Sequence, residues 1–437
     1  ISVNNSTNQI LHDFKNVIKF LDICRENETK IFVRETNYTE TFIHKSYMKN
    51  NDNYYVEING KILCIVSILK TFQTVNSRSE RRKMLIVYGS TLALIASIIA
   101  CTKSLKYWLE MGDEMIISLK YQLLGMKENI MDIVRAKYNK TDFPCKTGCV
   151  AVVTGGSRGI GASVVKMLLQ CDMDVIIGCR KIKNGEETIK QIRESGVTSG
   201  NAVVYELDNS SLECVKKFAN NIKENYEKVH VLINNAGIMF TPYGETSDGF
   251  EQQWVVNYLS HFLLTAMLMP LLCNAGTFEN SARIINVSSC AHLLGVINFD
   301  DINYYKSKSF PTKKAYAQSK LAQVIFTRML QQIFEKKKYP IKIYAVHPGI
   351  VNTDLFEHTS IQKLPLFKDI FFKSPEKGAI TTVYVAVNKE VENRGGSYFS
   401  NCLETAVNPI ANDVVTQEKL LHLSLEQTLL TDIFQYL

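Results

Sequence analysis

The sequence predicts an α/β protein whose main domain contains a doubly wound parallel sheet. From Gly148 onward, short β-branched runs alternate with stretches long enough to hold a crossover helix. The runs are CVAVVT, DVIIG, AVVYEL, VHVLINN, RIINVSS, IKIYAVH and GSYF. In addition, the first run ends in a glycine-rich turn that leads directly into a helical stretch. We therefore expect a single domain over residues 147–437, with helices on both faces of the sheet and a C-terminal extension.

Composition and charge narrow the class of protein. Of the 437 residues, 46% are apolar and 21% are charged, which is typical of globular chains and excludes a disordered or fibrous protein. The net charge of +7 arises almost entirely before residue 147, so the main domain is nearly neutral and nucleic-acid binding is excluded. The eleven cysteines show no metal-ligand spacing, so we expect reduced thiols and no metal site.

A long uncharged stretch precedes the domain. Residues 84–102 read MLIVYGSTLALIASIIACT, and as a helix they would extend roughly 29 Å, close to the thickness of a bilayer core. We expect a single-pass membrane anchor here, with a buried core helix as the alternative. The preceding basic cluster favours a cytoplasmic N-terminus and a lumenal enzyme. Translation from Met84 would reverse that orientation, so the side of the catalytic domain stays open.

The regions on either side of the anchor carry no chemical motif. Residues 1–83 stay unassigned, with an artefact of gene prediction as one explanation and a strand pair around Asn59-Gly60 as one expected element. Residues 103–146 are expected to form an amphipathic, juxtamembrane helical region. Its long side chains favour a helix, which Asp142-Phe143-Pro144 should end.

The glycine-rich turn predicts a dinucleotide site. Its sequence is TGGSRGIG, over Thr154–Gly161. Glycines there allow a tight turn and close approach to a pyrophosphate, and the helix that follows offers backbone amides to it. Arg180 and Lys181 end the second run, where an NAD-selective site would place a carboxylate. Together with Arg158 these cations suit a 2′-phosphate, so we favour NADP(H), with NAD(H) as the alternative.

From these motifs the sequence resembles the short-chain dehydrogenase/reductase family, over roughly Thr147–Tyr398. The resemblance implies a Rossmann-type domain whose catalytic residues are Asn257, Ser289, Tyr316 and Lys320. Besides the cations Arg158, Arg180 and Lys181, it implies cofactor contacts from Gly155, Ser157, Gly159, Ile160, Gly161, Asp208, Asn235, Ala236, Gly237, Tyr316, Lys320, Pro348, Gly349, Val351 and Thr353. Among these, Asp208 matches the residue that contacts adenine, and Pro348–Thr353 matches the loop over the nicotinamide. The polyprenol-type relatives lack an arginine at position 180, so their nucleotide preference is not carried over.

The residue types agree with this chemistry. Tyr316 and Lys320 are four residues apart on an expected helix, so the ammonium can lie near the phenol. The ammonium favours phenolate, which lets the tyrosine exchange a proton while hydride moves to or from the cofactor. Ser289 would hydrogen-bond and orient the substrate carbonyl. Asn257 matches the asparagine that holds a proton-relay water in the family.

A second Tyr-x-x-x-Lys motif, Tyr304 with Lys308, competes with the first. It runs directly into Ser-Phe-Pro, which stops a helix. Tyr316, by contrast, opens the long periodic stretch AYAQSKLAQVIFTRMLQQIF. Because the motif depends on helix geometry, we assign the chemistry to Tyr316.

The long spacing between Ser289 and Tyr316 resembles the retinol-dehydrogenase branch of the family. The stretches HVLINNAGIM, DGFEQQWVVNYLSHFLLT, AYAQSKLA and HPGIVNTDLF resemble microsomal retinol dehydrogenases and, more closely, the polyprenol-type members. The apolar segment Leu355–Phe372 suits either ordinary packing or a lid over a greasy substrate. We therefore expect a membrane-associated NADP(H)-dependent oxidoreductase, located at the endoplasmic reticulum, that interconverts a lipophilic alcohol and its aldehyde or ketone. A polyprenol- or dolichal-type lipid is the first candidate, retinol/retinal the second and a steroid the third. The other classes left open are a catalytically silent binding protein on the same fold and a separate interaction module in residues 1–83; a homodimer is compatible with the resemblance.

Overall fold

The computed structural model describes residues 55–58, 61–64, 113–306, 310–357 and 372–437. The chain divides into two units, Ile1–Leu105 and Lys106–Leu437. In the first unit, β1 (Tyr55–Ile58) and β2 (Lys61–Cys64) pair antiparallel, which confirms the strand pair expected around Asn59-Gly60. The predicted anchor at residues 84–102 lies outside the described residues.

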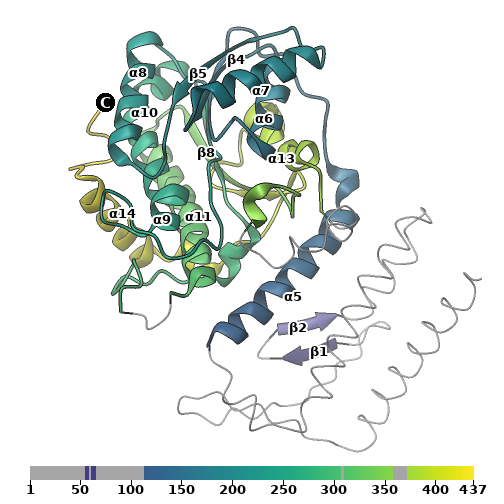
Figure 1. Cartoon of the computed structure of the whole chain (residues 1–437), viewed down its shortest axis with the longest axis vertical. Coiled ribbons are helices and arrows are strands. Elements are labelled where there is room, and N and C mark those ends of the chain that lie inside the picture. Colours follow the sequence, from purple (N-terminus) through teal and green to yellow (C-terminus); the bar gives the residue numbers. More distant parts are fainter. Residues whose placement is uncertain (1–54, 59–60, 65–112, 307–309, 358–371) are drawn as a thin grey trace, which may run out of the picture. The chain divides into compact units, whose positions relative to one another are not determined.

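The second unit contains an eight-stranded sheet in the order β10-β9-β8-β7-β6-β3-β4-β5 (Figure 1). All neighbouring strands are parallel except β9 and β10. The strands are β3 (Val150–Thr154), β4 (Asp174–Cys179), β5 (Asn201–Glu206), β6 (Val231–Asn234), β7 (Ala282–Val287), β8 (Ile341–His347), β9 (Tyr398–Ser400) and β10 (Leu403–Glu404). The chain order reverses between β3 and β6, which opens the crevice where open α/β sheets bind ligands.

Helices cover both faces of this sheet, which confirms the doubly wound α/β prediction (Figure 1). One face packs against α6 (Gly159–Gln170), α7 (Ile182–Glu194) and α13 (Pro375–Val387), and the other against α8 (Leu212–Asn225), α10 (Ser260–Ala275) and α11 (Thr312–Lys337). Because successive strand residues point to opposite faces, Val152 belongs to one buried cluster and Val153 to the other. The strands are buried on both faces, so their sequences are nearly continuous apolar runs.

The C-terminal extension packs on the same domain. Its helix α14 (Val414–Thr428) is tied to the segment before α10, because Trp254 Nε1 donates to Gln427 Oε1 at 2.8 Å. The Tyr258 and Ser424 hydroxyls are also hydrogen-bonded, at 2.7 Å. The extension thus completes the core beside α10 and α11.

Among the described residues, one helical stretch is long and apolar enough to cross a bilayer. It comprises α9 (Gln252–Trp254), a π-helical turn (Val255–Leu259) and α10. Its apolar window is 94% buried inside the domain, so it is a core helix.

Helix α5 (Asp113–Val134) precedes the first strand of the sheet. A short 3-10 turn (Ala136–Tyr138) follows it, and the chain then runs without regular structure into β3. From residue 113 onward the structure thus contains the expected helix, which ends at Val134, ahead of Asp142-Phe143-Pro144. Its juxtamembrane role stays a prediction. Residues 103–112 are outside the part that the structure describes.

Candidate active site

The glycine-rich turn joins β3 to α6 at the carboxyl edge of the sheet. Gly155 and Gly159 have positive φ angles of 67° and 55°, which favour glycine. A Cβ at Gly161 would lie 2.1 Å from the Gly155 carbonyl oxygen, so only glycine fits there. All the predicted turn residues lie in this turn or the first turn of α6: Gly155, Ser157, Arg158, Gly159, Ile160 and Gly161.

This turn fits the phosphates of a dinucleotide. Arg158 occupies the N-cap position of α6 but makes no side-chain capping hydrogen bond, and the first turn of the helix carries no acidic residue. The amino-terminal amides of α6 are therefore left for an anion, which the helix dipole also favours. The backbone amides and the absence of Cβ atoms at the glycines both suit a phosphate group.

The loop after β6 is locked to the glycine-rich turn. The Thr154 hydroxyl accepts hydrogen bonds from the backbone amides of Asn235 and Ala236, each at 2.9 Å. Asn235 Nδ2 donates to the carbonyl oxygens of Thr154 (2.8 Å) and Gly155 (3.3 Å). These bonds join the ends of β3 and β6, the two strands where the chain order reverses, and so form the floor of the crevice.

The predicted 2′-phosphate residues lie at the end of β4. Arg180 is exposed directly after the strand, and Lys181 occupies the N-cap position of α7. The Thr188 hydroxyl on α7 donates to the Ser157 carbonyl at 2.7 Å, which holds this helix against the glycine-rich turn. Arg158 is also exposed and pairs with Asp354 at 2.9 Å. Three cations therefore stand near one end of the crevice.

Asp208 follows β5, as expected. Its Oδ1 accepts from the backbone amide and the hydroxyl of Ser210, at 2.9 and 2.7 Å. These bonds shape the turn before α8. A contact of Asp208 with adenine stays a prediction.

Tyr316 and Lys320 lie one turn apart in the first half of α11, as predicted. The Lys320 ammonium is 5.8 Å from the centre of the Tyr316 ring and donates to the Val287 carbonyl (2.9 Å) and to Gln323 Oε1 (3.1 Å). Burial lowers the pKa of Lys320 to about 7. Burial also raises the pKa of Tyr316, and the Ser289 hydroxyl opposes that rise. The site therefore holds a proton donor beside an amine that titrates near neutral pH.

Ser289 follows β7 and faces this pair. Its hydroxyl accepts from the Ala291 amide at 3.2 Å and caps a short 3-10 helix, Cys290–Leu294. The preceding residue, Ser288, donates from its hydroxyl to the Lys320 carbonyl at 2.8 Å, which attaches the end of β7 to α11. The serine and the tyrosine are thereby fixed on two elements that are bonded to each other.

Asn257 lies in the π-helical turn before α10. Its Oδ1 accepts from the Ile238 amide at 2.9 Å, and its Nδ2 donates to the Ile238 carbonyl (3.0 Å) and the Ser319 hydroxyl (2.9 Å). A Cβ at Gly237 would lie 3.2 Å from Asn257 Oδ1 and 3.6 Å from Lys320 Nζ. The four residues predicted to be catalytic are therefore gathered at one place, and π-turns of this kind are frequent at functional sites.

The loop after β8 closes over the glycine-rich turn. It contains Pro348, Gly349, Val351 and Thr353, and its Gly349 has a φ of 91°. The Thr353 side chain lies against the glycine-rich turn, because a Cβ at Gly159 would be 3.3 Å from its methyl group. The structure therefore brings this predicted loop to the nucleotide end of the crevice.

In the second Tyr-x-x-x-Lys motif, the described residues 304–306 are not helical. Tyr304 lies in a turn with a φ of 58°, and its hydroxyl donates to Gln318 Oε1 at 3.5 Å. Lys308 is among the residues that the structure does not describe. The prediction that Tyr316, rather than Tyr304, stands on the long helix is confirmed.

An aromatic cluster next to Tyr316 is the part of the site that the sequence did not predict. The Phe240 ring packs edge-on against Tyr316 at 5.4 Å, and Tyr121 of α5 packs edge-on against Phe240 at 5.2 Å. Leu355 and Phe356 join this cluster. Of the predicted lid, residues 358–371 lie outside the described residues. The signal available in the sequence of α5 was the recurrence, three or four residues apart, of side chains that share one face of the helix.

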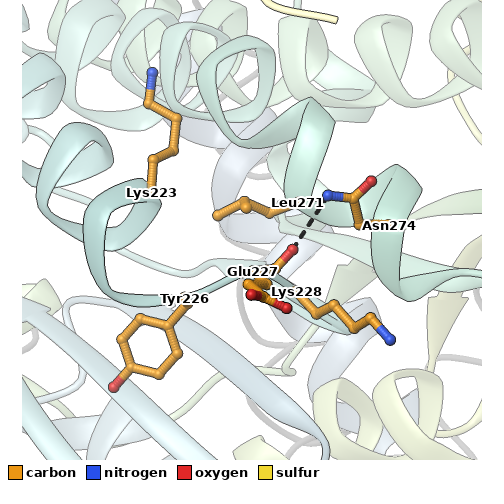
Figure 2. A pocket seen from close by; sticks show the side chains of 6 residues that line it. All are labelled: Lys223, Tyr226, Glu227, Lys228, Leu271 and Asn274. Atoms are coloured by element: carbon orange, nitrogen blue, oxygen red, sulfur yellow. Dashed lines mark hydrogen bonds between the residues drawn. The ribbon is translucent and has the colours of Figure 1, made fainter.

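A surface hollow of about 460 Å³ lies at the opposite edge of the sheet, ahead of β6 (Figure 2). It is lined by Lys223, Tyr226, Glu227, Lys228, Leu271 and Asn274. Asn274 Nδ2 donates to the Glu227 carbonyl at 3.3 Å across it. None of the predicted site residues lines this hollow, because they lie at the opposite, carboxyl ends of the strands.

The fold and the glycine-rich turn define a dinucleotide-binding α/β protein, and comparison with known proteins identifies its family. The model of the short chain dehydrogenase family matches residues 149–363. Human polyprenol dehydrogenase is 37% identical over 295 residues, which cover 67% of this chain and 88% of that protein. Human retinol dehydrogenase 14 is 39% identical over 294 residues, which cover 63% of this chain and 85% of that protein.

A crystal structure of a protein from Mycobacterium paratuberculosis matches with a TM-score of 0.54 at 31% identity, covering 66% of this chain and 96% of that one. The chain therefore belongs to the short-chain dehydrogenase family. It is an oxidoreductase that acts on CH–OH groups of a small-molecule substrate, and its fold binds a nicotinamide dinucleotide.

Proposed function

We propose that this protein is a membrane-associated, NADP(H)-dependent oxidoreductase that interconverts a lipophilic alcohol and its aldehyde or ketone. One observation carries the proposal: Ser289, Tyr316 and Lys320 meet at the carboxyl edge of the sheet, beside the glycine-rich turn. We infer a polyprenol- or dolichal-type substrate first, a retinoid second and a steroid third. We assign the anchor to residues 84–102 and the location to the endoplasmic reticulum membrane.

The nicotinamide, when bound, supplies or accepts the hydride. In the reducing direction Tyr316 gives its hydroxyl proton to the substrate oxygen, and in the oxidising direction it takes that proton back. The Lys320 ammonium stabilises the phenolate that remains. Ser289 donates a hydrogen bond to the substrate oxygen and so orients the carbonyl group. We assign to Asn257 the water that returns a proton towards Lys320.

The cations around the nucleotide end support NADP(H). Arg180 and Lys181 stand where an NAD-selective member of the fold carries an acidic side chain. Guanidinium groups bind phosphate through paired, charge-assisted hydrogen bonds. Arg158 adds a third positive charge on the glycine-rich turn. To bind the phosphate, its guanidinium group would have to leave its ion pair with Asp354. The 2′-phosphate is thus the group that these side chains suit.

The surroundings of Tyr316 support an apolar substrate. Met239 and Ala291 are buried against the Tyr316 ring, and partly buried Phe240, Leu355 and Phe356 pack on them. Relatives at 37% and 39% identity carry the names polyprenol dehydrogenase and retinol dehydrogenase 14. The uncharged stretch at residues 84–102 would bring such an enzyme to the membrane in which these lipids dissolve.

The function is tested by NADPH consumption on membranes that contain the full chain, with a polyprenal, retinal and a steroid ketone as substrates. Tyr316→Phe should lower turnover by about a thousandfold, because general acid catalysis is lost. NADPH binding should persist in this variant. Tyr304→Phe is the matched control and should keep its activity. Activity that survives in Tyr316→Phe but disappears in Tyr304→Phe would overturn the assignment, and a wild type that binds NADPH without turnover would favour a binding protein.

The cofactor preference is tested in the same assay. Arg180→Asp should raise the KM for NADPH by about tenfold to a hundredfold, since a hydrogen-bonded charge pair contributes about 1.5–3 kcal/mol. The KM for NADH should change little. Lys190→Asp, which reverses an exposed charge further along α7, is the control. Equal losses for both cofactors would show that Arg180 only stabilises the loop.

A further inference from the structure

Helix α5 lies outside the part of the chain that matches the family model, yet it contacts the active-site end of the domain. The match begins at residue 149, whereas α5 ends at Val134. Figure 1 shows α5 alongside the domain, outside the helix layers on the two faces of the sheet. It contacts α11 and the 3-10 helix Cys290–Leu294, which directly follows Ser289. The helix therefore lies outside the part that matches the family model, yet it contacts the elements that carry Ser289 and Tyr316.

Three aromatic rings connect α5 to Tyr316. The Tyr121 and Phe240 ring centres are 5.2 Å apart with the planes at 88°, and the Phe240 and Tyr316 centres are 5.4 Å apart at 79°. Such edge-on pairs are attractive and directional, so each ring restricts the next. The Tyr121 hydroxyl also donates to the Lys313 carbonyl at 2.9 Å, three residues before Tyr316 on α11. Tyr121 thus contacts both the helix and the ring stack that surround the reacting hydroxyl.

Phe240, the middle ring, is held in an unfavourable backbone conformation. Its φ is 56°, which side chains with a Cβ rarely adopt. The Gln253 side chain stabilises this conformation, because its Oε1 accepts from the Phe240 amide at 2.8 Å. Strained residues of this kind persist only where neighbouring contacts enforce them. Tyr121 supplies one of those contacts.

The other end of α5 is attached to the loop after β8 by a buried polar network. Asp132 Oδ1 pairs with Lys373 Nζ at 2.8 Å and accepts from Asn401 Nδ2 at 2.9 Å, and its Oδ2 accepts from the Ile350 amide at 3.2 Å. Asp132 is only 7% exposed. A buried carboxylate needs such partners to offset its desolvation. The first half of α5, through Tyr121, and its C-terminal end, through Asp132, are therefore both attached to segments that border the site.

We propose that α5 forms the outer wall of the substrate site and that Tyr121, through Phe240, is a positioning residue that selects bulky apolar alcohols and aldehydes. The inference rests on the proposed oxidoreductase function. Loss of the Tyr121 ring frees Phe240 from its restrained position, so a long substrate loses a surface along which to align. A short aldehyde needs only Ser289 and Tyr316, and it should react as before.

The test compares farnesal with hexanal as substrates of the full chain in detergent micelles. In Tyr121→Ala, kcat/KM for farnesal should fall by about tenfold, mainly through KM, which is the size of effect that a changed apolar pocket gives. For hexanal it should stay within about twofold of the wild type. Tyr121→Phe keeps the ring and should restore farnesal turnover. Tyr138→Ala, at a 45% exposed tyrosine just beyond α5, is the matched control.

Farnesol binding by calorimetry, without turnover, separates this inference from the proposed function. One outcome is that the wild type binds farnesol, that Tyr121→Ala weakens this binding, and that no aldehyde is reduced. In that case the proposed oxidoreductase function is wrong, whereas the role of α5 in the substrate site is supported. If the wild type reduces both aldehydes and Tyr121→Ala changes kcat/KM equally for both, or for neither, the proposed role of α5 and Tyr121 is wrong. A wild type that does not bind farnesol overturns it as well. NADPH binding in each variant shows that the domain is folded, and Tyr121→Leu replaces the alanine variant if that one does not fold.

Discussion

The nucleotide side and the substrate side of the crevice are built in different ways. On the nucleotide side, closely packed loops set the shape. Thr154 ends β3, Gly155 and Asn235 lie in the loops after β3 and β6, and Gly161 is in the first turn of α6. On the substrate side, side chains set the shape. The stack of aromatic rings there begins with Tyr121, on the helix α5 that precedes the sheet in the sequence. The shape of the first region depends mainly on closely packed backbone, and the shape of the second depends on side chains.

This difference predicts unequal tolerance to substitution. A turn whose backbone atoms are in contact has no room for an added methyl group, because no side chain can move away. A wall of side chains can repack at modest cost, and selectivity then changes before stability does. Matched substitutions on the two sides should therefore differ in size and in kind.

The largest contrast is expected between two glycines in helices. Gly161→Ala would place a Cβ 2.1 Å from the Gly155 carbonyl oxygen and 2.7 Å from Asn235 Nδ2, so the turn must open. We expect NADPH binding to fall by at least about a hundredfold, or the domain to unfold. Gly125→Ala, in α5, meets only Ile350 Cδ1 at 3.7 Å and should stabilise the helix by about 0.5–1 kcal/mol. Thermal unfolding and NADPH titration measure both; similar behaviour of the two variants would contradict the comparison.

An intermediate effect is expected at Asp132. Asp132→Asn leaves the Lys373 ammonium without its buried counter-ion and should cost about 3 kcal/mol. Because the ion pair attaches α5 to the loop after β8, hydrogen exchange should quicken in α5 and stay slow in β7. Asp142→Asn, at an exposed carboxylate, is the control. Adding Lys373→Met to Asp132→Asn should recover part of the loss, since no unpaired charge is then buried; no difference between the single and double variants would argue against the pair.

The smallest effect, over about one pH unit, is a dependence of stability on pH that arises from two buried histidines. Burial lowers the pKa of His261, which contacts Thr154, to about 3, and that of His347, at the end of β8, to about 4. Below pH 6.5 these histidines are protonated in the unfolded chain but stay neutral in the folded protein. For each of them, the free energy of unfolding should therefore fall by about 1.4 kcal/mol for every unit that the pH decreases, down to the folded pKa.

His347→Leu separates the two histidines. Neither ring nitrogen of His347 has a hydrogen-bond partner, so the substitution should cost little at pH 7. Between pH 6.5 and pH 5.5, urea unfolding of this variant should lose about 1 kcal/mol less than that of the wild type. An unchanged slope would mean that His347 is protonated or hydrated in the folded state.

Most of the fold could be predicted from the sequence because its signals are local. The seven predicted runs correspond to β3 to β9, and the glycine-rich turn lies where the first run ends. The strand β10 was missed, since two residues that pair antiparallel at an edge leave no periodic pattern. The choice of Tyr316 over Tyr304 was also local, because the Ser-Phe-Pro stop decides which tyrosine can stand on a helix.

The sequence by itself determined the α/β class, the dinucleotide turn and the gathering of Ser289, Tyr316 and Lys320, because each depends on a short motif at the end of a strand or on a helix face. Only the tertiary structure decided that α5 borders the site. The contacts of Tyr121 with Phe240 and of Asp132 with Lys373 join residues far apart in the chain. Such contacts depend on which helix faces pack together in three dimensions, and the order of residues does not encode that locally.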